Sequence, residues 1–209
     1  MEKSVEPKRK NKLLAQRNCG DKTRSDILKA ATTLFAKKGF AGTAISEIAT
    51  KAKINQSLIY HHFGSKKGLW REMRFAIANS YFNAHNFIPF AGASLKQFLT
   101  QFVQSRVDFY KANPEVLRIV RWQQLESIQE KFHSPNPSHL ANWNLALTQL
   151  KQNGELRANI DPNLFRVMVV NIVYAAFDEQ NLALCDDFTK AQNAYLDFII
   201  DCLERALKP

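Results

Sequence analysis

Residues 43–66 read TAISEIATKAKINQSLIYHHFGSK, and this stretch decides the fold class that we predict. Apolar side chains recur at helical spacing in two short runs that are separated by a break at Lys53. Ala49 is small enough to let two helices cross closely, and three branched side chains are available to fill the wedge between them: Ile48, Ile54 and Ile59. The pattern therefore predicts a helix-turn-helix near residues 44–63 whose second helix faces outward.

Residues that begin and end helices bracket this stretch. Thr43 is expected to cap the first of the two helices, Asn55 the second, and Ser65 a longer helix that follows. Gly39 and Gly64 are expected to end the helices before them, because glycine readily takes the backbone conformation found there. A helix before Gly39 begins at Asp21 or Thr23 and completes a three-helix unit.

The outward side of the second helix carries residue types that suit the reading of DNA bases. Glutamine pairs with adenine through two hydrogen bonds, and leucine can meet a thymine methyl group. Tyrosine and histidine can donate to phosphates, as can groups at helix N-termini. The predicted DNA-contacting set is Thr43, Asn55, Gln56, Ser57, Leu58, Tyr60, His61 and Lys66. The alternative is a helix pair that does not bind DNA, in which Leu58 and Tyr60 are ordinary packing residues.

The charge of the chain is concentrated in its first third. Residues 1–75 carry 17 Lys and Arg against six Asp and Glu, whereas residues 76–209 carry 12 against 13. A basic module joined to a near-neutral one indicates a polyanionic partner, with double-stranded DNA as the first expectation. A membrane surface is the second possibility, but it requires an apolar or lipidated anchor, which the sequence does not show.

Other classes of protein are disfavoured by what the sequence lacks. The three cysteines have no spacing typical of a zinc site or a disulfide framework, and no apolar run is long enough to span a bilayer. We find no glycine-rich phosphate loop, zinc-protease helix or nucleophile elbow. We therefore expect a cytoplasmic protein that is not an enzyme and that needs no metal or cofactor.

The rest of the chain also follows helical patterns, and no segment alternates as a strand does. Helices are predicted at about 94–112, 114–131, 138–153, 162–182 and 187–207. The predicted fold is all-α. Its parts are a basic flexible arm (1–20), a helix-turn-helix DNA-binding domain (21–66) and a helical ligand-binding and dimerisation domain (67–209).

The N-terminal block resembles the TetR family of regulators. The resemblance rests on these residues: Ala31, Leu34, Phe35, Gly39, Phe40, Thr43, Ile48, Ala49, Ala52 to Phe63, Ser65, Lys66 and Leu69. It implies a homodimer of nine or ten helices per chain that binds a palindromic operator and is released by a small molecule. Most relatives carry glycine where this chain has Lys53, at a site that tends to need positive φ. Lys53 is therefore expected to store about 1 kcal/mol of strain. Leu58 stands where threonine is common, so the operator cannot be inferred from relatives.

The C-terminal part offers candidates for a ligand site and a dimer interface. Its aromatic residues are mostly expected in the core, but some can line a cavity between helices. The predicted ligand-binding set is Arg118, Trp122, Trp143, Tyr174 and Phe177, although Arg118 can instead pair with Glu115 or Glu126 on the surface. The segments 162–182 and 187–207 have broad apolar faces that form a four-helix dimer interface or cover only their own domain.

The predicted function is a transcriptional regulator, a repressor that a small-molecule effector releases from DNA. The alternative is a nonspecific DNA-binding interaction protein without a ligand, which a steep salt dependence without sequence preference would reveal.

Overall fold

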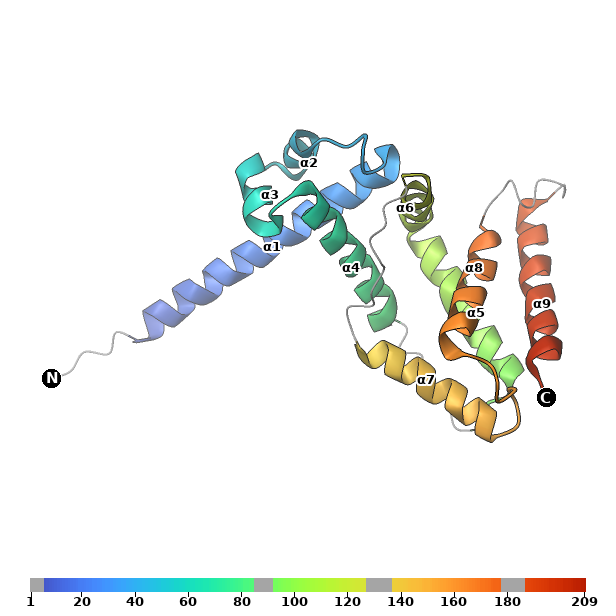
Figure 1. Cartoon of the computed structure of the whole chain (residues 1–209). Helices are drawn as coiled ribbons and strands as arrows, with labels where there is room; N and C mark the ends of the chain where they lie inside the picture. Colours follow the sequence, from blue (N-terminus) through green and yellow to red (C-terminus); the bar gives the residue numbers. More distant parts are fainter. Residues whose placement is uncertain (1–5, 85–91, 127–136, 178–186) are drawn as a thin grey trace. The chain divides into compact units, whose positions relative to one another are not determined.

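The computed structural model describes residues 6–84, 92–126, 137–177 and 187–209. These ranges contain nine helices and no strand, which confirms the predicted all-α class (Figure 1). The helices are α1 (Glu6–Lys38), α2 (Ile45–Ala52), α3 (Gln56–Phe63), α4 (Lys66–Ala84), α5 (Leu95–Ala112), α6 (Pro114–Leu125), α7 (Pro137–Gln152), α8 (Pro162–Ala175) and α9 (Phe188–Leu207). Two predicted helices end earlier than expected, α6 at Leu125 and α8 at Ala175, and the residues that follow lie largely outside the described ranges.

The chain divides into two compact units. The first is Met1–Ile77 with Arg118–Glu130, and the second is Ala78–Leu117 with Lys131–Pro209. The predicted boundary between residues 66 and 67 therefore falls inside the first unit. The difference arises because the first half of α4 and the end of α6 pack with the N-terminal helices, which a boundary drawn from local patterns cannot include.

Helix α1 is longer than predicted. It begins at Glu6, so residues 6–20 are helical where we expected a flexible arm. This segment has no apolar stripe, but it is rich in Lys, Arg, Leu, Gln and Ala, which have high helix propensity. A prediction that relied on apolar periodicity missed it for that reason.

The core of the first unit joins all of its helices. Fully or almost fully buried side chains come from each of them: Ile27, Ala31, Phe35, Ile48, Ala49, Ile59, Phe63, Leu69, Trp70, Met73 and Ile119. The rings of Phe35 and Trp70 meet edge to face, with centroids 5.0 Å apart. An ion pair between Arg24 on α1 and Glu72 on α4 adds a polar link at the edge of this core. Helices α2 and α3 are thus held on a rigid base.

The second unit is built around α5. Helix α5 packs against α8 and α9, and α7 packs against α8. Phe98, Phe102, Trp143 and Phe165 form a ring cluster in which Trp143 lies 5.3–5.7 Å from the other three centroids. Asp161 caps α8 by accepting from the N–H groups of Asn163 and Leu164, and Asp187 caps α9 by accepting from Lys190 N–H.

No helix within the described ranges combines the length and the apolar character that a membrane crossing requires.

Candidate nucleic-acid interface

Helices α2 and α3 form the predicted helix-turn-helix. Ala49 is 3% exposed at the crossing, and Ile48 and Ile59 are completely buried. Ile54, in the turn, packs against the same core. A larger side chain at Ala49 would push the two helices apart, so the small residue sets how closely they cross.

The turn between the helices has the backbone conformation that we predicted. Lys53 is in the left-handed region, at φ 57° and ψ 44°, and it is the one non-glycine residue with positive φ in the described part of the chain. The turn closes through hydrogen bonds from Lys53 N–H to Thr50 O and from Ile54 N–H to Ala49 O. The Lys53 side chain is exposed, so no burial of the side chain compensates for the strained backbone.

The ends of α3 also follow the prediction. The Asn55 side chain accepts a hydrogen bond from Ser57 N–H at 3.1 Å, which identifies it as the N-cap. Gly64, at φ 72°, ends the helix. The Ser65 hydroxyl then accepts from Gly68 N–H and starts α4. The side-chain oxygen of Asn55, Oδ1, is thus already bound to the backbone of α3. A contact of the Asn55 side chain with DNA would therefore use its NH₂ group.

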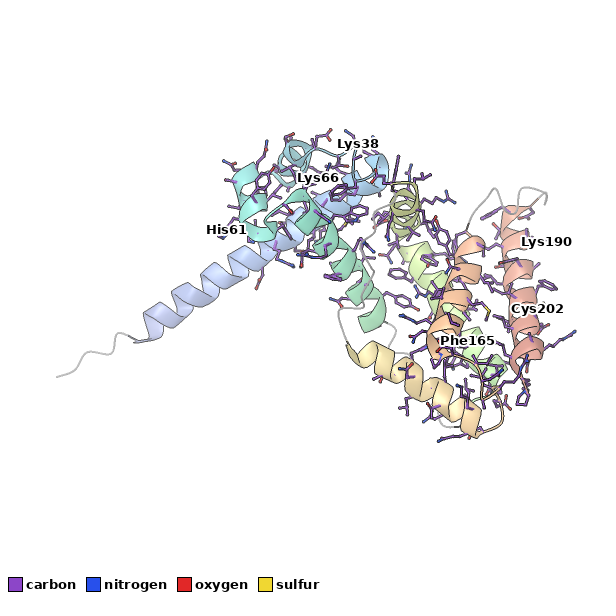
Figure 2. The ribbon with its side chains drawn as sticks, in the orientation of Figure 1. Lys38, His61, Lys66, Phe165, Lys190 and Cys202 are labelled. Carbon is purple, nitrogen blue, oxygen red and sulfur yellow. The ribbon has the colours of Figure 1, made fainter. Side chains whose placement is uncertain are left out.

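One side of α3 is free of packing. Ile59 and Phe63 are buried, whereas the opposite side consists of exposed residues: Gln56, Ser57, Leu58, Tyr60 and His61. Leu58 is 37% and Tyr60 49% exposed, so neither is an ordinary core residue. Figure 2 shows His61 on α3 at the edge of the unit. Five of the predicted contact residues therefore lie on a single exposed surface, which we call the α3 face.

Thr43 does not have the role that we predicted. The N-cap of α2 is Ala44, whose N–H is bound by the Glu47 carboxylate at 3.1 Å. Thr43 is 1% exposed, and its hydroxyl donates to Gly39 O at 2.7 Å. Its hydroxyl stabilises the turn after α1, and its contact with a phosphate stays a prediction that this burial disfavours. The N-cap prediction was wrong because the Thr43 hydroxyl binds the carbonyl oxygen of Gly39, directly after α1, and not a backbone N–H of α2.

Charged side chains reinforce the same turn. The hydrogen bond from Lys38 and the bond from Ala44 N–H hold the pKa of Glu47 below its usual value. Lys66 Nζ donates to Ala41 O at 3.3 Å and lies 4.6 Å from the centre of the Phe40 ring. Lys66 thus lies against the α1–α2 turn, and its contact with a phosphate stays a prediction.

The end of α6 grips this turn in a way that the sequence did not reveal. The Glu126 carboxylate accepts from Phe40 N–H and Ala41 N–H, both at 3.0 Å. The Trp122 indole donates to Ala36 O at 3.2 Å. We call these contacts the α6 clamp. Its partners are more than 80 residues apart in sequence, so no local pattern indicates it. The Trp122 indole N–H is used in this clamp, and its contact with a ligand stays a prediction.

The remaining ligand candidates belong to both units. Trp143 is 6% exposed, belongs to the ring cluster of the second unit and donates its indole N–H to Pro162 O. Tyr174 and Phe177 are half-buried and lie beside Tyr110, with centroids 6.4 and 5.1 Å away. Arg118 is exposed in the first unit. Tyr174 and Phe177 share the contact with Tyr110, and the Tyr174 hydroxyl donates to the O atom of Leu117, the residue before Arg118, at 3.4 Å. A ligand site made by the whole set stays a prediction.

Two family models match the chain. The model "Bacterial regulatory proteins, tetR family" covers residues 27–73, and "Tetracyclin repressor-like, C-terminal domain" covers residues 99–205, about half of the chain. The chain belongs to the TetR family. The first match contains the whole helix-turn-helix. The second contains most of α5 and all of α8, which the resemblance of the N-terminal block did not reach.

Relatives agree with this assignment. The transcriptional repressor NicS of Pseudomonas putida is 37% identical over 120 residues, which cover 57% of this chain and 55% of NicS. The transcriptional repressor SCO4008 of Streptomyces coelicolor is 28% identical over 104 residues, half of each chain. The chain thus spans about half the length of these curated relatives.

Solved structures share the fold of this TetR family member. The putative transcriptional regulator SCO4942 from Streptomyces coelicolor matches with a TM-score of 0.65 at 22% identity, covering 90% of this chain and 99% of that one. The regulator FadR from Bacillus subtilis, in complex with stearoyl-CoA, matches with a TM-score of 0.64 at 18% identity over 84% and 97%. At this identity the likeness concerns the fold alone.

Proposed function

We propose that this TetR family protein is a sequence-specific DNA-binding transcriptional regulator, a repressor that a small molecule releases from its operator. The observation that carries the proposal is the α3 face, an exposed row of polar and apolar groups on a helix held by a buried core. Leu58 and Tyr60 add exposed apolar atoms to this polar surface, which suits contact with base edges as well as phosphates.

The α3 face has the chemistry of base recognition. A helix fits the major groove of B-DNA, which is about 12 Å wide. Gln56 can bind adenine through two hydrogen bonds, and Leu58 can contact a thymine methyl group, while Ser57, Tyr60 and His61 are suited to phosphates or base edges. The excess of positive charge in residues 1–75 adds attraction to the backbone.

We further propose that two copies bind together. Leu164 and Val167 on α8 are 71% and 55% exposed, and Phe198 on α9 is 65% exposed. In contrast, Leu196 and Ile199 on α9 are buried within their own chain, so only part of the apolar surface of this helix is available to a second copy. The exposed apolar residues of α8 and α9 support a four-helix dimer, and two α3 helices about 34 Å apart would read the halves of a palindrome.

The named repressors among the relatives, and a solved relative in complex with an acyl-CoA, support repression and control by a ligand. Helices α4 and α6 each have residues in both units, so they are the elements through which a ligand bound to the second unit would act on the first. Such a ligand weakens operator binding by its preference for the released state.

A random DNA library tests the proposal. Purified protein is equilibrated with the library at about 150 mM salt, and bound DNA is sequenced. We expect a palindrome to be enriched, and Gln56→Ala to alter the preferred bases. Gln101→Ala, which removes another exposed glutamine on a helix of the second unit, is the matched control and should leave the enriched sequence unchanged.

The alternative of nonspecific binding has its own signature in the same experiment. It gives no enriched sequence, the same result for both glutamine variants, and an affinity that falls steeply as salt rises. That outcome would contradict sequence-specific recognition by the α3 face.

A further inference from the structure

Two arginines of the second unit are half-buried and have no carboxylate partner among the described residues. Arg106 lies on α5 and Arg166 on α8, two helices that pack against each other. The Nε atoms of both side chains are shielded from solvent and have no hydrogen-bond partner among the described residues. Buried polar groups are nearly always hydrogen-bonded, so two such donors in one unit require an explanation.

The two guanidinium groups influence each other. Burial lowers the pKa of Arg166, and the positive charge of Arg106 lowers it further. The ion pairs that the structure shows in this unit involve Lys96 and Lys208, which already have carboxylate partners. Arginine stays charged in proteins, so this like-charge pair persists and attracts an anion.

Aromatic rings lie beside Arg106. The Arg106 guanidinium lies 4.2 Å from the centre of the Tyr81 ring and 5.6 Å from that of Phe102. Tyr110 is one turn further along α5, where burial raises the pKa of its phenol while the charge of Arg106 and a hydrogen bond with that guanidinium oppose the rise. The Tyr110 ring in turn contacts Tyr174 and Phe177, the two predicted ligand residues that share a location.

From this arrangement we propose that Arg106 and Arg166 bind an organic anion, a carboxylate or phosphate carried on an aromatic or other apolar body. The guanidinium fork donates paired hydrogen bonds to either group, and the anion neutralises both charges at once. The neighbouring rings contact the apolar body. The inference rests on the proposed function in one respect, since this anion would be the chemical class of the effector.

The structural alternative is that both arginines only fill space. In that reading the cation–π contact of Arg106 contributes to stability, and nothing binds. The two readings differ in the unliganded protein. Replacing a half-buried charge that has no carboxylate partner by an apolar chain of similar length should leave the free energy of unfolding unchanged or raise it, whereas loss of a needed contact should lower it.

Thermal unfolding of the full chain tests the site without DNA. The melting temperature is measured against increasing benzoate, phenyl phosphate or neutral benzamide at fixed ionic strength. We expect a saturable rise with at least one of the two anions and none with benzamide. The anion that raises it more identifies the acidic group.

Three variants complete the test. Arg106→Met and Arg166→Met should each weaken anion binding by about tenfold or more without lowering the melting temperature of the unliganded protein. Arg157→Met removes an exposed arginine of the same unit and should bind as wild type does. Three results would each contradict the proposed anion site. They are wild-type anion binding by both Arg106→Met and Arg166→Met, an equal rise in melting temperature with benzamide, and no rise with either anion. Because no DNA is present, these results are independent of operator recognition.

Discussion

Replacing Lys53 with glycine should stabilise the protein. At φ 57° a side chain with a Cβ costs about 1–2 kcal/mol relative to the right-handed helical region, and glycine avoids this cost. Glycine also makes the unfolded chain more flexible, which takes back about 0.4–1 kcal/mol. The exposed Lys53 side chain loses little packing when it is removed. The expected net gain is therefore about 0.5–1 kcal/mol.

For a chain of this length such a gain raises the melting temperature by about 1–4 °C, measurable by circular dichroism or calorimetry. Lys51→Gly is the matched control, because Lys51 is an exposed helical residue in α2 two positions away. There the same substitution should destabilise by about 1 kcal/mol. Lys53→Ala removes the charge but keeps the strain, so it should change stability by less than about 0.5 kcal/mol.

The critical result is that glycine lowers the melting temperature at position 51 and raises it at position 53. If Lys53→Gly left the melting temperature unchanged or lowered it, the left-handed backbone would not be a source of strain. If Lys53→Ala stabilised as much as the glycine, the effect would come from charge in this basic unit, and the conformational reasoning would be refuted.

Other parts of the structure give further predictions. Gly39→Ala should destabilise by about 2–4 kcal/mol in chemical unfolding, since φ is +74° and a Cβ would lie 2.8 Å from the Trp122 ring; wild-type stability would contradict the α6 clamp. Phe165→Ala, at 2% exposure, should cost about 3–5 kcal/mol, whereas Phe198→Ala, at 65%, should chiefly weaken the dimer in sedimentation; equal losses of stability would argue against both assignments. The pKa of Asp201 is lowered, mainly by the hydrogen bond from Lys96. The contribution of this carboxylate to stability is therefore present at neutral pH and lost as pH falls below about 4. Asp201→Asn should therefore show a shallower loss of stability in acid, and an unchanged acid profile would mean that the pair contributes nothing.

Local features of the helix-turn-helix could be predicted from sequence because their causes are local. Asn55 caps α3 through a bond to a residue two positions away, and Gly64 ends α3 through its own backbone conformation. The strained turn at Lys53 was predicted from the glycine that related sequences carry there. The exposed side of α3 follows from helical spacing once Ile59 is placed in the core.

Features that depend on distant partners could not be predicted in this way. The sequence suggests Thr43 as the N-cap of α2, but the Thr43 hydroxyl donates to Gly39 O, and the N-cap is Ala44. The contacts of Trp122 and Glu126 with the end of α1 depend on how α6 packs. The residues next to Trp122 and Glu126 in sequence do not indicate that packing.

The pair of arginines lies between these cases. Arg106 stands one turn from Phe102 and one turn from Tyr110, so its place on the apolar side of α5 was visible in the spacing. Its neighbour Arg166 belongs to another helix, and only the packing of α5 against α8 brings the two charges together.

The most direct test of operator reading by the α3 face is a measurement of affinity for single-base variants of the selected operator. Wild type and Gln56→Ala are titrated by fluorescence anisotropy with the operator and with duplexes in which one symmetric base pair is replaced. If Gln56 reads an adenine, wild type should discriminate against one replaced A·T pair by about 5- to 100-fold. Gln56→Ala should bind the operator more weakly and lose that discrimination at the same position alone. A uniform loss for every duplex, or no loss at all, would contradict the proposal that α3 reads the operator.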